Sequence, residues 1–276
     1  MQARCVGRTI VTQRLMAVLA HPDDESLGLG GTLATYAARG VETYVVTATR
    51  GERGRYFADV ERPSDDDVGR VREAELRAAT RTLGVRELVL LGYVDGELDR
   101  ADPNEAVGRI VAQIRRVRPQ VVVTFDPFGA YGHPDHVAIC QLTTAAVLAA
   151  ADPPFATGAP AHRVSKLYYL VFDERAWAVY QSAFKKLTTH VDGEERGAVS
   201  WPRWAVSAEI DTYAHWRSAW SAVRRHETQL SAYARLDELT PAQHESLWGS
   251  ATFYRALSTV NGGRSRETDL FDGVAG

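Results

Sequence analysis

Short apolar runs alternate along the chain with longer segments in which apolar residues recur every three or four positions. The runs cover residues 15–20, 41–49, 88–91 and 121–125 and carry almost no charge. Such runs are typical of strands buried on both faces of a parallel sheet. The segments between them have the period of amphipathic helices. This alternation predicts an α/β fold: a Rossmann-like, mostly parallel, doubly wound sheet flanked by helices and joined by right-handed crossovers.

The predicted helices begin at residues with capping chemistry. Ser64, which precedes three aspartates, is expected to cap a helix that ends at residue 83. Asp102 and Pro103 open the next helix. The remaining expected elements are a helix from Asp24 to about residue 39, strands at 166–172 and, at the sheet edge, 205–210, and a long amphipathic helix at 213–236.

The length and composition predict one large domain. The chain has 276 residues, of which 45% are hydrophobic and 24% charged, enough to bury a sizeable core. We expect residues 1–13 to form a flexible arm, residues 14–260 a single α/β domain, and residues 261–276 a mobile tail. A net charge of −3 provides no basic surface for nucleic acid and favours a small-molecule partner.

No apolar segment approaches the length that spans a bilayer. The run after Arg14 is also too short for a signal peptide, so we expect a cytoplasmic protein. Cys5 and Cys140 have neither metal-motif nor disulfide-framework spacing. A homo-oligomer is compatible with the sequence.

The first predicted strand leads directly into the motif His21-Pro22-Asp23-Asp24-Glu25. In open α/β sheets the carboxyl ends of the strands border the ligand crevice. His21 and Asp24 are three residues apart and can converge on one metal ion if Asp24 begins a helix. Asp23 then points elsewhere and can act on a bound water. The alternative is that Asp23 or Asp24 is an ordinary helix N-cap beside a surface histidine.

A second motif, Gly132-His133-Pro134-Asp135-His136, follows the predicted strand at 121–125. His133 and His136 are again three apart at the start of a helix, so both can face the same crevice. Neutral imidazole and carboxylate are the ligands that zinc prefers. The two histidines could instead be solvated loop residues. Two such clusters at strand ends favour a metal site over that alternative.

Together the two motifs resemble those of the LmbE-like, or PIG-L, family of zinc-dependent N-acetylglucosamine deacetylases. The resemblance extends to Thr49-Arg50-Gly51-Glu52 and to 72–76, with a weaker match at 210–211 and 226–229. It is closest to the actinobacterial branch that includes the mycothiol-biosynthesis deacetylase and the mycothiol conjugate amidase. His226, in the weak match, is the remaining histidine of interest. The others, His190, His215 and His244, are expected to be surface or packing residues.

The resemblance implies a role for each motif residue. The metal ligands would be His21, Asp24 and His136, with zinc as the metal, although iron(II) also accepts such donors. Asp23 would act as general base and then as acid toward the amine. The oxyanion would be stabilised by His133, held charged by Asp135, and by Tyr131.

Arg72 and Asp95 are candidates for binding sugar hydroxyls or an appended group. Arg72 is implied by the resemblance and Asp95 by its position after a strand. Two alternatives stay open: Asp135 could cap the helix at 136, and Arg72 could pair with Glu73 or Glu75 within its helix.

These observations predict a zinc-dependent hydrolase that removes the acetyl group from an N-acetylglucosaminyl conjugate. An amidase acting on a mycothiol-type conjugate is the closest alternative. A metal-stabilised, non-catalytic sugar- or nucleotide-binding module is another, for which four protein ligands should close the site. The chain has no Gly-x-Ser-x-Gly elbow and no phosphate-binding loop. A metallophosphoesterase would normally need a second metal and more bridging carboxylates.

Overall fold

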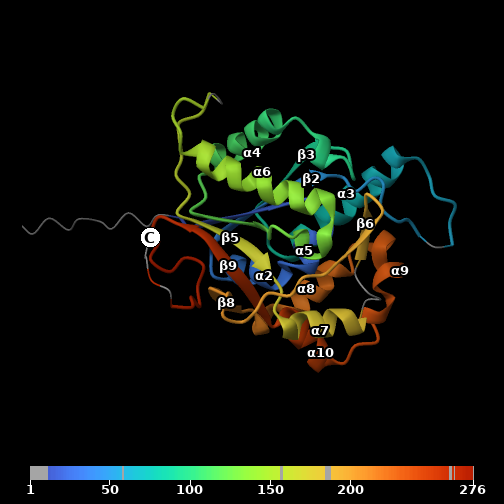
Figure 1. The fold of residues 1–276 in the computed structure, drawn as a ribbon. Helices are drawn as coiled ribbons and strands as arrows, with labels where there is room; N and C mark the ends of the chain where they lie inside the picture. The colour runs from blue at the N-terminus through green and yellow to red at the C-terminus, as the bar shows by residue number, and fades with distance from the viewer. Residues whose placement is uncertain are drawn as a thin grey trace, which may run out of the picture.

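The computed structural model describes residues 12–57, 59–155, 158–183, 188–260, 263 and 265–275. Its centre is a seven-stranded sheet in the order β3-β2-β1-β4-β5-β9-β8 (Figure 1). The strands of this sheet are β1 (Arg14–Leu19), β2 (Glu42–Thr49), β3 (Glu87–Tyr93), β4 (Val121–Phe125), β5 (Lys166–Val171), β8 (Ala208–Asp211) and β9 (Ser250–Ser258). The predicted α/β fold is confirmed.

The five strands from β3 to β5 are parallel, and their chain order reverses between β1 and β4. Leu15 of β1 pairs with Val121 of β4, so these two strands lie side by side. In a doubly wound sheet such a reversal opens a crevice at the carboxyl ends of the strands. The predicted motifs follow these two strands and therefore meet at the reversal.

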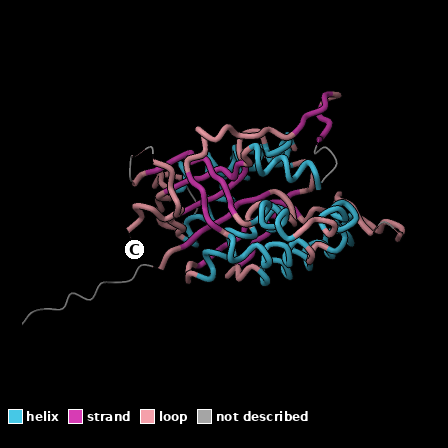
Figure 2. Tube along the Cα trace, turned by 90° about the horizontal axis from the view of Figure 1, so that it is seen from below, coloured by secondary structure: helices cyan, strands magenta, loops and turns pink. Residues whose placement is uncertain are grey.

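Helices cover both faces of the sheet (Figures 1 and 2). One face carries α4 (Pro103–Val117) and α6 (Pro134–Ala150), and the other carries α2 (Gly30–Ala38), α3 (Asp65–Thr82) and α8 (Trp216–Val223). Ser64 caps α3 by accepting from the Asp67 N–H, and Asp102 caps α4 by accepting from that of Glu105, as predicted. None of the helices in the described ranges has the length and apolar character of a membrane span.

The helix expected from Asp24 is interrupted. It forms α1 (Asp24–Leu27) and, after two residues, α2. The interruption accompanies close packing of α2 on α8, because a Cβ at Gly30 would lie 2.9 Å from the Cβ of Ala219. Gly30 therefore serves helix packing.

The prediction of one long helix at 213–236 is wrong. The segment consists of η2 (Tyr213–His215), α8, η3 (Glu227–Gln229), α9 (Leu230–Tyr233) and η4 (Ala234–Leu236). A regular helix does not continue through residue 228, because the Thr228 N–H donates to the Glu75 side chain instead of to a helical carbonyl. The spacing of apolar residues favours a continuous helix here, but a buried tertiary hydrogen bond overrides that preference.

Further elements lie around the central sheet. α7 (Glu174–Ala183) and α10 (Pro241–Trp248) pack together near α8 (Figure 1). A separate hairpin of β6 (Thr188–Val191) and β7 (Glu194–Gly197) contacts the short helix α5 (Gly129–Gly132). β9, which sequence pattern did not reveal, runs antiparallel between β5 and the edge strand β8.

The expected tail at 261–276 is corrected over its described part. Leu270 and Phe271 are buried in the core, and Glu267 accepts from buried Lys166 and from Arg255, each at 2.6 Å. The domain therefore extends beyond residue 260. The expected arm at 1–13 lies outside the described residues, except for 12 and 13.

Glu267→Ala is expected to lower the free energy of unfolding by about 3–5 kcal/mol, because it leaves the Lys166 ammonium buried without its partner. Urea titration measures the loss. Glu194→Ala, at an exposed position of β7, is the control and should change stability by no more than about 0.5 kcal/mol. Equal stability of the two variants would contradict the packing of the tail.

Candidate metal centre

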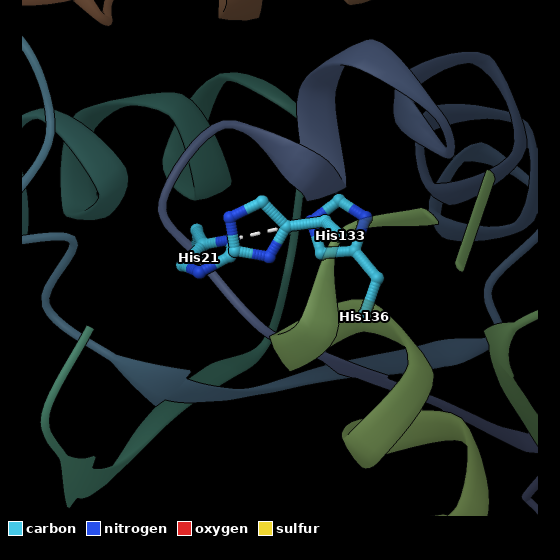
Figure 3. Close-up of side chains that lie close together, drawn as sticks. All are labelled: His21, His133 and His136. Atoms are coloured by element: carbon cyan, nitrogen blue, oxygen red, sulfur yellow. Dashed lines mark hydrogen bonds between the residues drawn. The ribbon is translucent and has the colours of Figure 1, made fainter. Parts of the chain in front are cut away.

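The loops that follow β1 and β4 bring three imidazoles together at the carboxyl edge of the sheet. His21 comes from the end of β1, and His133 and His136 come from the start of α6 (Figure 3). One ring nitrogen of each lies within 4.8 Å of the other two. His21 and His136 are buried, and His133 is half-buried. The two His-Pro-Asp motifs therefore face one crevice.

Asp24 joins His21 and His136 in a second close group. His21 Nδ1 and His136 Nε2 are 3.1 Å apart, Asp24 Oδ1 is 3.5 Å from His136 Nε2, and Asp24 Oδ2 is 3.9 Å from His21 Nδ1. Asp24 Oδ2 also accepts the His21 N–H at 2.8 Å, which holds the carboxylate against the end of β1. Asp23 makes no side-chain capping bond, so the alternative of an ordinary N-cap is not supported.

The chemistry of these donors fits a divalent cation. Burial lowers the pKa of His136 far below its ordinary value, so its imidazole is neutral and keeps a lone pair. Burial also raises the pKa of the Asp24 carboxyl to about 7, so the ionised form needs a positive charge beside it. Two imidazoles and a carboxylate are a ligand set found at catalytic zinc and at iron(II).

His133 differs from the other two histidines. Its Nδ1 accepts the Asp135 N–H at 3.2 Å, so His133, and not Asp135, is the N-cap of α6. Burial and the nearby His21 lower the pKa of His133 to about 4. This environment favours a neutral His133, whose proton then lies on Nε2 because Nδ1 accepts the Asp135 N–H. The expectation that Asp135 holds His133 charged is not supported by this geometry.

The Asp135 and Asp95 carboxylates converge on His21 instead. Asp135 Oδ2 lies 3.0 Å and Asp95 Oδ1 3.1 Å from His21 Nε2. Asp135 also accepts the N–H groups of Gly96 and Leu98, at 2.7 and 3.1 Å. Burial alone would lower the pKa of His21, but these carboxylates outweigh it and raise that pKa to about 10. A cation bound at Nδ1 would therefore have to displace a proton from His21. Carboxylates that bind the second nitrogen of a ligand histidine fix its orientation.

Asp135→Asn is therefore expected to weaken metal binding by about 10–100-fold, because it removes a carboxylate that orients His21. Competition with a chromogenic chelator measures the affinity. Asp173→Asn is the matched control: Asp173 is also a buried carboxylate after a strand, but it accepts from Ala176 and Arg203. Unchanged metal affinity in Asp135→Asn would contradict the orienting role.

Asp23 is held by Arg72, which the sequence had suggested as a substrate-binding residue. The Arg72 guanidinium donates to Asp23 Oδ2 at 3.2 Å, and to the carbonyls of Pro22 and Gly51 at 2.7 Å each. Arg72 is only 3% exposed. Arg72 therefore supports the loop that carries Asp23. Its contact with a substrate stays a prediction.

Tyr131 borders the crevice from α5. Its ring is edge-on to His136 and His133, with centroids 5.4 and 6.0 Å apart. Burial raises the pKa of the Tyr131 phenol, so the hydroxyl keeps its proton and can donate. The preceding residue, Ala130, has a φ of 61° and donates its N–H to Asp126 Oδ1 at 2.8 Å.

The family model for GlcNAc-PI de-N-acetylase, PIG-L, matches residues 16–147. A 1D-myo-inositol 2-acetamido-2-deoxy-α-D-glucopyranoside deacetylase from Streptomyces griseus is 36% identical, over 97% of this chain and 91% of its own. The chain belongs to the PIG-L family. A protein with the same description from Mycobacteroides abscessus is 38% identical, over 80% of this chain and 83% of its own.

A solved member of this fold supports the architecture. The crystal structure of a conserved protein from Thermus thermophilus is 26% identical and has a TM-score of 0.64, covering 90% of this chain and 96% of its own. This structural match covers more of the chain than the segment at 16–147 that the family model matches. The same fold therefore accounts for nearly the whole chain.

Two further buried residues of this PIG-L chain were not assigned a role from sequence. Glu25 and His226 are fully buried, with Glu25 Oε1 2.8 Å from His226 Nε2. Glu25 lies inside the first motif and His226 in the weak family match. The sequence therefore marked both residues as candidates. Their spacing of 201 residues concealed the pairing.

Proposed function

We propose that this chain is a zinc-dependent hydrolase that removes the acetyl group from the 2-acetamido group of an N-acetylglucosaminyl-inositol. The proposal rests on one observation: a buried imidazole and carboxylate cluster lies at the crevice of a chain that matches, over almost all its length, relatives named for this deacetylation. A fold alone would not support an activity, but site and relatives together do.

In this proposal His21, Asp24 and His136 hold the metal, and Asp23, supported by Arg72, stands beside it. When bound, zinc supplies a Lewis acid and lowers the pKa of a coordinated water to about 7. Asp23 accepts the proton of the water that attacks the acetyl carbonyl, and returns it to the departing amine.

The oxyanion, which is the former carbonyl oxygen on the tetrahedral acetyl carbon, receives hydrogen bonds from neutral donors. The Tyr131 hydroxyl and the Nε2–H of His133 lie on the α5 and α6 side of the crevice. Donors placed before the reaction stabilise developing charge without reorganising. In this assignment His133 acts as a neutral imidazole, and Asp135 acts through His21.

An amine-release assay tests the proposal with four compounds: the N-acetylglucosaminyl-inositol, N-acetylglucosamine, diacetylchitobiose, and a mycothiol-type amide conjugate. We expect the highest kcat/KM for the inositol glycoside, loss of activity on chelation and recovery with zinc. Circular dichroism should show that the chelated protein keeps its fold, because the large α/β core does not need the metal. Preference for the conjugate would make the enzyme an amidase, and no amine release with zinc present would refute the proposal.

A further inference from the structure

The backbone at Asp23 adopts a conformation that its surroundings must maintain. Its φ is 105°, a region that residues with a side chain rarely occupy. Such a conformation persists only where neighbouring contacts determine it, and it is common at functional sites. Asp23 lies between the metal ligands His21 and Asp24, so a relaxed backbone would move its carboxylate relative to the metal centre.

One contact that holds Asp23 comes from Glu25. Glu25 is in turn contacted by His226, which is 201 residues away in the sequence. Glu25 Oε2 accepts the Asp23 N–H at 3.0 Å. Glu25 Oε1 accepts the Ser26 hydroxyl at 2.5 Å and lies 2.8 Å from His226 Nε2. A fully buried carboxylate requires hydrogen-bond donors, and His226 is a donor from outside its own loop. His226 thus determines where Glu25 can place its second oxygen.

A second contact reaches the carboxylate of Asp23 through α3. The N–H and hydroxyl of Thr228 donate to the two oxygens of Glu75, at 2.8 and 2.7 Å. Glu75 is one helical turn beyond Arg72, whose guanidinium donates to Asp23 Oδ2. Thr228 therefore anchors the helix that presents Arg72.

The third residue of the same turn contacts the loop after β2. The Gln229 side chain donates to the Arg55 carbonyl at 2.9 Å. His226, Thr228 and Gln229 are all buried, so these contacts are shielded from water. In the interior, such hydrogen bonds rigidify the groups that they join.

We propose that the turn at 226–229 is the positioning element for Asp23. It holds the Asp23 backbone through Glu25, and it holds the Asp23 carboxylate through Glu75, α3 and Arg72. The proposal rests on the role of Asp23 as general base given above. It assigns to the carboxyl-terminal third a part in proton transfer, with no contact to the substrate or the metal.

His226→Leu and His226→Gln test the proposal. Leucine fills the space but cannot donate to Glu25, so kcat should fall by about 10²-fold, as misplacement of a catalytic group does, with KM and zinc content unchanged. Glutamine can donate through its amide and should restore kcat to within several-fold of the wild type. Rescue by glutamine and a loss confined to kcat are outcomes that a purely structural histidine would not produce.

His244→Leu is the matched control. His244 is also buried, but it packs among Trp216, Trp220 and Trp248, with ring centroids 4.8–5.9 Å away. It should lower the thermal midpoint without lowering kcat. An equal loss of kcat in His244→Leu, a wild-type kcat in His226→Leu, or a loss of zinc in His226→Leu would each overturn the proposal.

Thr228→Val provides a second route if His226→Leu does not fold. It deletes one hydroxyl from the Glu75 contact and should reduce kcat several-fold, again with KM and zinc content unchanged. An unchanged kcat would overturn the proposal.

Asp23→Asn separates this inference from the proposed function. If Asp23→Asn is inactive while both turn variants are fully active, only the positioning role fails. If Asp23→Asn retains turnover, the proposed base itself is wrong.

Discussion

Asp23→Asn is expected to bind zinc with the wild-type stoichiometry and to lose about two to four orders of magnitude in kcat, the usual contribution of a positioned proton acceptor. Asparagine keeps the size of the side chain and can still accept from Arg72, so the loop should stay in place. Zinc analysis by mass spectrometry and steady-state amine release measure the two effects.

Asp24→Asn is the neighbouring comparison. Asp24 Oδ1 lies 3.5 Å from His136 Nε2, within the proposed ligand set, whereas Asp23 turns toward Arg72. Asp24→Asn should therefore lose metal first and activity as a result. If Asp23→Asn emptied the site while Asp24→Asn kept its zinc without turnover, the roles of the two neighbours would be exchanged.

His136→Ala is expected to lose most of its zinc and all measurable activity, because it removes one of three proposed ligands and a catalytic site has no spare protein ligand. Distance alone does not separate His136 from His133, since both have a ring nitrogen near His21. Two contacts do. Asp24 approaches Nε2 of His136, and the Nδ1 of His133 is occupied by the Asp135 N–H.

His133→Ala is thus the paired variant for His136→Ala. It should keep its zinc and lose about 10²–10³-fold in kcat, the effect of deleting one oxyanion donor. Equilibrium dialysis followed by metal analysis distinguishes the two variants. Zinc loss in His133→Ala together with zinc retention in His136→Ala would transfer the ligand role to His133.

Much of the site could be predicted because local chemistry and strand order coincide. The uncharged runs at 15–20 and 121–125 are buried strands, and each leads directly into a His-Pro-Asp motif. In a doubly wound sheet such strands are expected to end at a common edge. That the two are adjacent is a property of the sheet order, but convergence at one edge follows from the alternating pattern.

The helix caps at Ser64 and Asp102 were predictable because each capping hydrogen bond is local and joins residues three positions apart. The break at 226–229 was not, because the Thr228 N–H bonds to Glu75, 153 residues away. The spacing of apolar residues at 213–236 indicates which face of a helix would be buried. This spacing contains no information on a distant carboxylate. The burial of the tail was not predictable for the same reason: Glu267 stabilises the fold by accepting from Lys166, which lies on β5, 101 residues away.

The sequence by itself therefore determined the fold class, the edge of the sheet that carries the chemistry, and which residue types gather there. Only the tertiary structure decided which group each of them faces. Arg72 turns to the loop of Asp23, and Asp95 and Asp135 turn to His21 Nε2. The physical reason is that hydrogen-bond partners of buried charges are chosen by proximity in the folded core, where every charged group must be satisfied by whichever donor or acceptor packing brings within reach.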